Sequence, residues 1–119
     1  MQYAIMVYES EQEFAKRNDA THQEAYWGAY QAYSQALAAA GVAAGGTALH
    51  PPHTSTTLWL EEGHRKVQDG PYADTKEQLG GMFIVEVPNL DVALDWAARC
   101  PAASTGRVEV RPLLPMNAG

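Results

Sequence analysis

The sequence predicts an α+β domain of the ferredoxin-like type, in which two helices lie on one face of an antiparallel sheet. Two observations lead to this prediction. The expected elements follow the order strand, helix, strand, then an inserted hairpin, then strand, helix, strand. Two of the expected strands carry apolar side chains on both faces, which is typical of strands in the middle of a sheet. The chain has 119 residues, so residues 1–119 are expected to form one domain.

The first predicted strand is Gln2–Tyr8, and its two faces are both apolar. The acidic segment Glu9–Asn18 is predicted as a loop. A helix is then expected, because Thr21 and Glu24 have the spacing of a capping box. Gly41 is expected to end this helix. One stripe of the helix carries residues at helical spacing, namely Tyr26, Tyr30, Tyr33, Leu37 and Ala40. We interpret the stripe as the core face, with an aromatic wall of a ligand site as the alternative.

Three short strands are predicted in the middle of the chain, over Val42–Leu49, Ser55–Glu61 and His64–Gln68. The run His50-Pro51-Pro52-His53 separates the first two strands, because prolines cannot donate hydrogen bonds to a neighbouring strand. Glu62-Gly63 is expected to form a hairpin turn between the other two. The segment Asp69–Gly81 reads DGPYADTKEQLGG and is predicted as a loop, because glycine and proline interrupt it.

The last part of the chain predicts a strand, a helix and a strand. The strand Gly81–Val87 is apolar on both faces. Asn89 is expected to cap the helix Leu90–Arg99, and Pro101 is expected to stop it. The buried stripe of this helix is predicted to be Leu90, Ala93, Leu94 and Ala97. The final strand, Arg107–Leu113, alternates valines with charged residues, so its outer face should be solvated.

Two helices can cover only one face of such a sheet. Because the central strands are apolar on both faces, the uncovered face predicts burial against a second copy of the chain. We therefore expect a homodimer.

Composition excludes several classes of partner and cofactor. The chain carries 8 Lys and Arg against 14 Asp and Glu, so its formal charge is −6, which argues against nucleic acid and anionic membranes as partners. No apolar stretch is long enough to span a bilayer, and no signal peptide is visible. The single cysteine, Cys100, cannot form an internal disulfide, so a cytoplasmic location is expected. No glycine fingerprint for a nucleotide is present, and we expect no cofactor.

Three segments carry a resemblance to a known family. They are the run DGPYADTKEQLGG, the helix with Trp96-Ala97-Ala98-Arg99, and the ending Val108-Glu109-Val110-Arg111-Pro112. In this order and spacing, the sequence resembles the YCII-related superfamily, in the branch named for its DGPF motif, with Tyr72 in place of the phenylalanine. The resemblance implies a ferredoxin-like fold that dimerises into an α+β barrel. Most members are uncharacterised, some occur in genetic company with alternative sigma factors, and a related branch includes a dehydrochlorinase.

The resemblance also suggests an acid–base pair. In the wider superfamily this role is suggested for a histidine near the start of the first helix together with an aspartate. His22 matches the histidine, and Asp69 is the best match by motif for the aspartate. The structural alternatives are a solvated histidine at a helix start and an aspartate that binds backbone amides in a turn.

Four further residues are candidates for substrate binding: Tyr72, Lys76, His50 and His53. Tyr72 could donate its phenol to a substrate, and Lys76 could bind an anionic group. His50 and His53, with His64 further along, have a spacing that zinc accepts, but no HExxH helix or cysteine pair accompanies them. We therefore predict no metal site.

These residues leave two hypotheses for function. In the first, a cleft between the sheet and the Asp69–Gly81 loop binds a small organic molecule and performs cofactor-free acid–base chemistry, with His22 as the base and Asp69 as its partner or the acid. In the second, the domain is a non-catalytic ligand-binding or protein-interaction module, accessory to transcriptional regulation.

Overall fold

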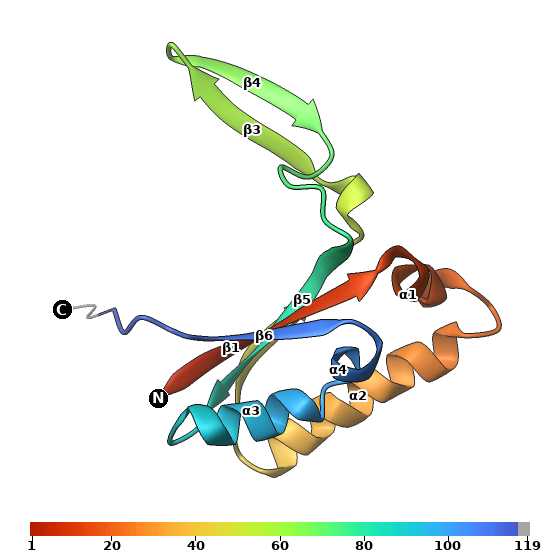
Figure 1. Ribbon diagram of the computed structural model, residues 1–119, viewed down its shortest axis with the longest axis vertical. Helices are drawn as coiled ribbons and strands as arrows, with labels where there is room; N and C mark the ends of the chain where they lie inside the picture. The colour runs from red at the N-terminus through yellow and green to blue at the C-terminus, as the bar shows by residue number, and fades with distance from the viewer. Residues whose placement is uncertain (117–119) are drawn as a thin grey trace.

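A four-stranded antiparallel sheet forms the centre of the protein (Figure 1). The computed structural model describes residues 1–116. The strands of this sheet are β1 (Gln2–Ser10), β2 (Ala43–Ala48), β5 (Glu77–Glu86) and β6 (Arg107–Pro112). Their order across the sheet is β2-β5-β1-β6. This order, with the helices on one face, is that of a ferredoxin-like α+β fold, so the predicted fold class is confirmed.

The central strands β1 and β5 divide their side chains between two apolar faces. Ile5 pairs with Phe83 and Tyr3 with Val85 on the helix-covered face. The next residues along each strand point to the other face, where Ala4, Met6, Met82 and Ile84 lie half-buried. We call these four residues the open-face stripe. The prediction that both central strands are apolar on both faces is confirmed.

Two longer helices cover one face of the sheet, α2 (Gln23–Ala39) and α3 (Leu90–Ala98) (Figure 1). The Tyr33 hydroxyl joins them by donating a hydrogen bond of 2.8 Å to the carbonyl oxygen of Trp96. The short elements are α1 (Glu11–Ala15), α4 (Ala102–Thr105) and the 3₁₀ turns η1 (Lys16–Asn18) and η2 (Pro52–Thr54). No helix within residues 1–116 has both the length and the apolar character that crossing a membrane would require.

The predicted loop at Glu9–Asn18 is wrong. Strand β1 continues through Ser10, whose hydroxyl accepts a hydrogen bond from the Glu13 amide and so caps α1. The predicted capping box at Thr21 is also wrong, since α2 begins at Gln23. Instead the Asp19 carboxylate accepts a hydrogen bond from the Thr21 amide, and the local turn replaces the cap.

Helix α3 departs from its predicted buried stripe. Ala93 and Ala97 are buried, but Leu90 and Leu94 are about half exposed, at 46% and 47%. Val92 and Trp96 pack against the core beside the two alanines, so the buried face of α3 is turned away from its leucines. The predicted cap is confirmed, since Asn89 accepts a hydrogen bond of 3.0 Å from the Val92 amide.

A separate hairpin projects from the end of the sheet (Figure 1). It consists of β3 (Thr56–Glu61) and β4 (His64–Asp69), and we call these two strands the arm. The predicted turn is confirmed, because Glu62 and Gly63 both have positive φ angles, of 50° and 79°, as a type I′ turn requires. After the arm, β5 begins at Glu77, so the last residues of the predicted loop Asp69–Gly81 are in fact a strand.

Candidate functional site

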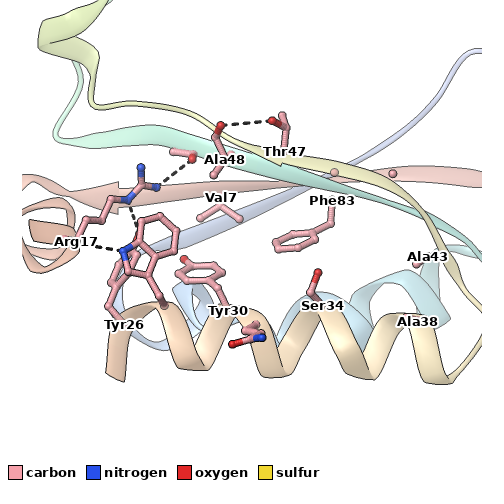
Figure 2. Close-up of a pocket in the computed structure, with 16 residues that line it drawn as sticks. Val7, Arg17, Tyr26, Tyr30, Ser34, Ala38, Ala43, Thr47, Ala48 and Phe83 are labelled. Carbon is pink, nitrogen blue, oxygen red and sulfur yellow. Dashed lines mark hydrogen bonds between the residues drawn. The ribbon is translucent and has the colours of Figure 1, made fainter. Parts of the chain in front are cut away.

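A cavity lies between α2 and the strands β2 and β5 (Figure 2). Its volume is about 630 Å³. We call it the α2 cleft. The cleft exists because β2 reads AAGGTA, so this edge of the sheet has little side-chain volume with which to meet the helix. Helix α2 supplies the opposite wall, which includes Tyr26, Trp27, Tyr30 and Ser34.

Aromatic side chains form part of the wall of the cleft. The rings of Tyr30 and Phe83 are nearly parallel, with an interplanar angle of 9° and centroids 6.5 Å apart. Figure 2 shows both rings between α2 and the sheet, with Arg17 at one end of the cleft. Tyr26 continues the wall, its ring centroid 5.2 Å from that of Tyr30. The near-parallel rings of Tyr30 and Phe83 therefore offer a flat apolar surface, and polar side chains such as Ser34 and Thr47 line the rest of the cleft.

A buried carboxylate lies behind this wall. Glu9 is 1% exposed and lies on the helix-covered face at the end of β1. The Tyr26 hydroxyl donates a hydrogen bond of 2.5 Å to Glu9 Oε1, and the Tyr30 hydroxyl donates one of 3.2 Å to Oε2. Arg17 Nη2 lies 3.5 Å from Oε1. The three side chains around Glu9 thus compensate its burial.

Arg17 connects α2 and β5 at this end of the cleft by hydrogen bonds. Its Nε donates a hydrogen bond of 2.8 Å to the Tyr26 hydroxyl, and Nη2 donates one of 3.1 Å to the Gly80 carbonyl oxygen. Its guanidinium also lies 4.5 Å from the centroid of the Phe14 ring. Gly80 is needed beside it, because a Cβ there would come within 2.8 Å of Phe14 and 3.1 Å of both Arg17 and Glu9.

Burial keeps the two tyrosines protonated. Desolvation, together with the hydrogen bond to Glu9, raises the pKa of Tyr26 far above its ordinary value. Desolvation and the nearby charge of Glu9 raise the pKa of Tyr30 in the same direction. Both side chains are therefore neutral phenols that can donate and accept hydrogen bonds at physiological pH.

A second cavity, of about 590 Å³, lies on the other side of Tyr26 and Tyr30. Glu9 and His22 both line it. The His22 ring Nδ1 is hydrogen-bonded to a carboxylate oxygen of Asp19, three residues earlier. This bond lowers the pKa of the Asp19 carboxyl below its ordinary value. His22 and Asp19 both remain substantially exposed to solvent.

The family model for the YCII-related domain matches residues 1–117. The chain belongs to the YCII-related domain family. One relative is an uncharacterised protein of Rhizobium meliloti (strain 1021), 46% identical over 67 residues, which are 55% of this chain. The match covers 54% of that protein, about half its length. The resemblance to the superfamily is thus confirmed, while the DGPF branch stays a prediction.

The YCII-related domain keeps its two predicted acid–base residues on different elements. His22 precedes α2, whereas Asp69 ends β4 in the arm and is exposed. Figure 1 shows the arm projecting away from α2. Asp69 does not line the cavity that His22 lines. Within one chain, the carboxylate that contacts His22 is Asp19, and the pairing with Asp69 stays a prediction that concerns an assembly of two chains.

The other predicted binding residues of the YCII-related domain lie near the base of the arm. Tyr72 is 93% exposed, and Lys76 and His53 are exposed as well. His50 lines a third cavity, of about 510 Å³, together with residues of the loop after β4 such as Asp74. This cavity lies where the sequence placed a cleft between the sheet and the Asp69–Gly81 loop. Within residues 1–116, no three His, Cys, Asp or Glu side chains gather in a way that could hold a metal ion.

Sequence reasoning missed Glu9 and Arg17. A signal for Glu9 was present, because the alternation of Tyr3, Ile5 and Val7 on the buried face of β1 reaches Glu9 two residues later. Arg17 has no such signal, since its partners include backbone carbonyl oxygens that only the folded chain brings to it. The core-face interpretation of the tyrosine stripe is confirmed for Tyr33 and for Tyr30, which packs against the core. The ligand-site alternative stays a prediction for Tyr26 and Tyr30, which line cavities.

Proposed function

We propose that this YCII-related domain binds a small organic molecule in the α2 cleft. The observation that carries the proposal is the cleft itself. Its volume of about 630 Å³ is in the range of small-molecule sites, and aromatic side chains are typical of the lining of such sites. Arg17 is the charged side chain in its lining, and it is paired with Glu9. We therefore expect an uncharged ligand with an apolar, flat body.

Filling the cleft tests this function. Ser34 is exposed on α2 and lines the cleft, so a phenylalanine there would occupy the space of the ligand. In an NMR screen of small aromatic fragments, we expect fragments that bind the wild type to bind S34F at least about tenfold more weakly. Q35F is the matched control, because Gln35 is exposed on the same helix outside the cleft lining. A screen without hits, or hits that S34F binds equally well, would contradict the proposal.

A second candidate function is cofactor-free acid–base chemistry at His22. The observation that favours it is the hydrogen bond between His22 Nδ1 and Asp19 beside the second cavity. If Nδ1 donates its proton to the carboxylate, Nε2 is left unprotonated and can take a proton from a substrate C–H group. Asp19 then orients the ring and stabilises the imidazolium that forms. The imidazolium exchanges its proton with solvent and then returns a proton from Nε2 to the substrate carbon, which restores the neutral ring.

Deuterium exchange provides a test of the base. With acetophenone in D₂O, we expect the wild type to accelerate exchange at the methyl group, and H22Q to lower that acceleration by about a hundredfold. H64Q is the control, because His64 is exposed at the start of β4 in the arm, away from the second cavity. Equal rates for the wild type and H22Q would remove the assignment of His22 as a base.

We also infer that the protein acts as a homodimer. The open-face stripe and the exposed apolar side chains of the arm support this inference, because both surfaces lie outside the core of the single chain. The dimer would place two copies of the α2 cleft on the outer sides of the paired sheets.

A further inference from the structure

Arg17 determines the direction of the hydrogen bonds that the Tyr26 hydroxyl makes beside Glu9. A guanidinium can only donate, so Arg17 Nε donates to the Tyr26 hydroxyl oxygen at 2.8 Å. The proton of Tyr26 then points to its other partner, Glu9 Oε1, at 2.5 Å. Tyr26 thus both accepts and donates within the protein.

Tyr30 is in a different position. Glu9 forms an ion pair with Arg17, and an ionised carboxylate only accepts hydrogen bonds. Tyr30 must therefore donate its proton to Glu9 Oε2, 3.2 Å away. This is the one hydrogen bond of the Tyr30 hydroxyl among residues 1–116. Its lone pairs are free to accept a hydrogen bond, but its proton is not available to a ligand.

The Tyr30 ring also belongs to the flat aromatic surface of the cleft. It is half-buried, and it stands nearly parallel to Phe83, 6.5 Å away. Tyr30 lines the cleft, and Figure 2 shows its hydroxyl on the side of the ring toward Arg17, so a planar molecule lying against these rings would meet the hydroxyl oxygen at that edge. Arg17 cannot accept a hydrogen bond from a ligand, because a guanidinium group has only donors.

Resting on the proposed use of the α2 cleft, we propose that its ligand is a planar aromatic molecule that donates a hydrogen bond, from a hydroxyl or N–H group, to the hydroxyl oxygen of Tyr30. Glu9 causes this preference for hydrogen-bond donors, because the Tyr30 hydroxyl already donates its proton to Glu9. Molecules of the same shape that carry only acceptors would leave the oxygen without a partner and would place their own acceptor against it.

A matched pair of probes tests the preference. 2-Naphthol carries a hydroxyl donor, and 2-methoxynaphthalene has nearly the same shape without one. In NMR titrations of the full-length protein, we expect 2-naphthol to bind the wild type about tenfold more tightly than 2-methoxynaphthalene. We expect Y30F to bind the two probes equally.

Y33F is the control for the loss of a tyrosine hydroxyl from α2, because Tyr33 donates to the Trp96 carbonyl oxygen and lies outside the cleft lining. It should keep the tenfold preference. If the wild type binds both probes equally, or if Y30F keeps the preference, the inference is overturned while the cleft remains a binding site. If neither probe binds the wild type, the proposed function fails with it. The comparison on the wild type decides the matter even if Y30F does not fold.

Discussion

At the scale of single residues, Glu9 is the most informative side chain. A carboxylate that is 1% exposed is tolerated only where donors surround it. Here those donors come from three places in the sequence, namely Tyr26 and Tyr30 on α2 and Arg17 in η1. The same contacts fix the tyrosine protons and close one end of the α2 cleft. Glu9 therefore links the stability of the domain to the chemistry of its candidate site.

Replacing Glu9 by glutamine should destabilise the protein by about 3 kcal/mol, because it leaves the Arg17 charge, 9% exposed, without its counter-charge and turns an NH₂ group toward donors. Urea denaturation followed by circular dichroism measures the free energy of unfolding. E13Q is the matched control, since Glu13 forms a more exposed ion pair with Lys16 and should lose less than about 1 kcal/mol. Equal stabilities for E9Q and E13Q would show that the buried cluster contributes nothing.

At the scale of elements, the sequence predicts the strands and helices that have a repeating apolar pattern, and it misses the elements that depend on single contacts. Alternating apolar residues correctly predicted β1 and the core of β5, and a 17-residue helix with an apolar stripe was visible in α2. Helix α1 has five residues, too few for a periodic signal, and it forms because Ser10 caps it. The exposure of Leu90 and Leu94 depends on which side of α3 faces the core, and the structure places Val92 and Trp96 there instead of the leucines.

The candidate site divides in the same way. The tyrosines of α2 could be named from their spacing, and their packing in the core is confirmed, while their part in a ligand site stays a proposal. The cleft beside them could not, because it results from β2 being too small to fill the space next to α2. His22 was placed at the start of its helix from the sequence, but its partner within the chain, Asp19, lies in a segment whose turn geometry was not predicted.

The arm is an element that the single chain does not explain. A two-stranded hairpin is marginally stable in water unless it packs on something. Leu58, Leu60 and Val67 lie on one of its faces, and all three are about half exposed or more. Thr57 holds its base, with the hydroxyl donating to the Gly70 carbonyl oxygen at 2.8 Å. The apolar face further out predicts a partner.

At the scale of the whole molecule, two apolar surfaces are left uncovered by the single chain, namely the open-face stripe and the apolar face of the arm. A second copy of the chain can cover both. An association with two-fold symmetry places the same patch of each chain against its equivalent, so the open-face stripes would pack against each other. Each arm would then lie beside the other subunit instead of in solvent. This arrangement would bury the strands that are apolar on both faces, as the sequence predicted, and leave α2 and its cleft accessible.

Light scattering after size exclusion should therefore give twice the 12.9 kDa of one chain. A glutamate in place of Ile84 would put two charges into the contact between the paired stripes, because each subunit contributes one. We expect I84E to elute as a monomer. Q35E adds the same charge on the exposed face of α2 and should remain dimeric. A wild-type mass of one chain at micromolar concentration would contradict the dimer, and a dimeric I84E would place the contact somewhere other than the open face.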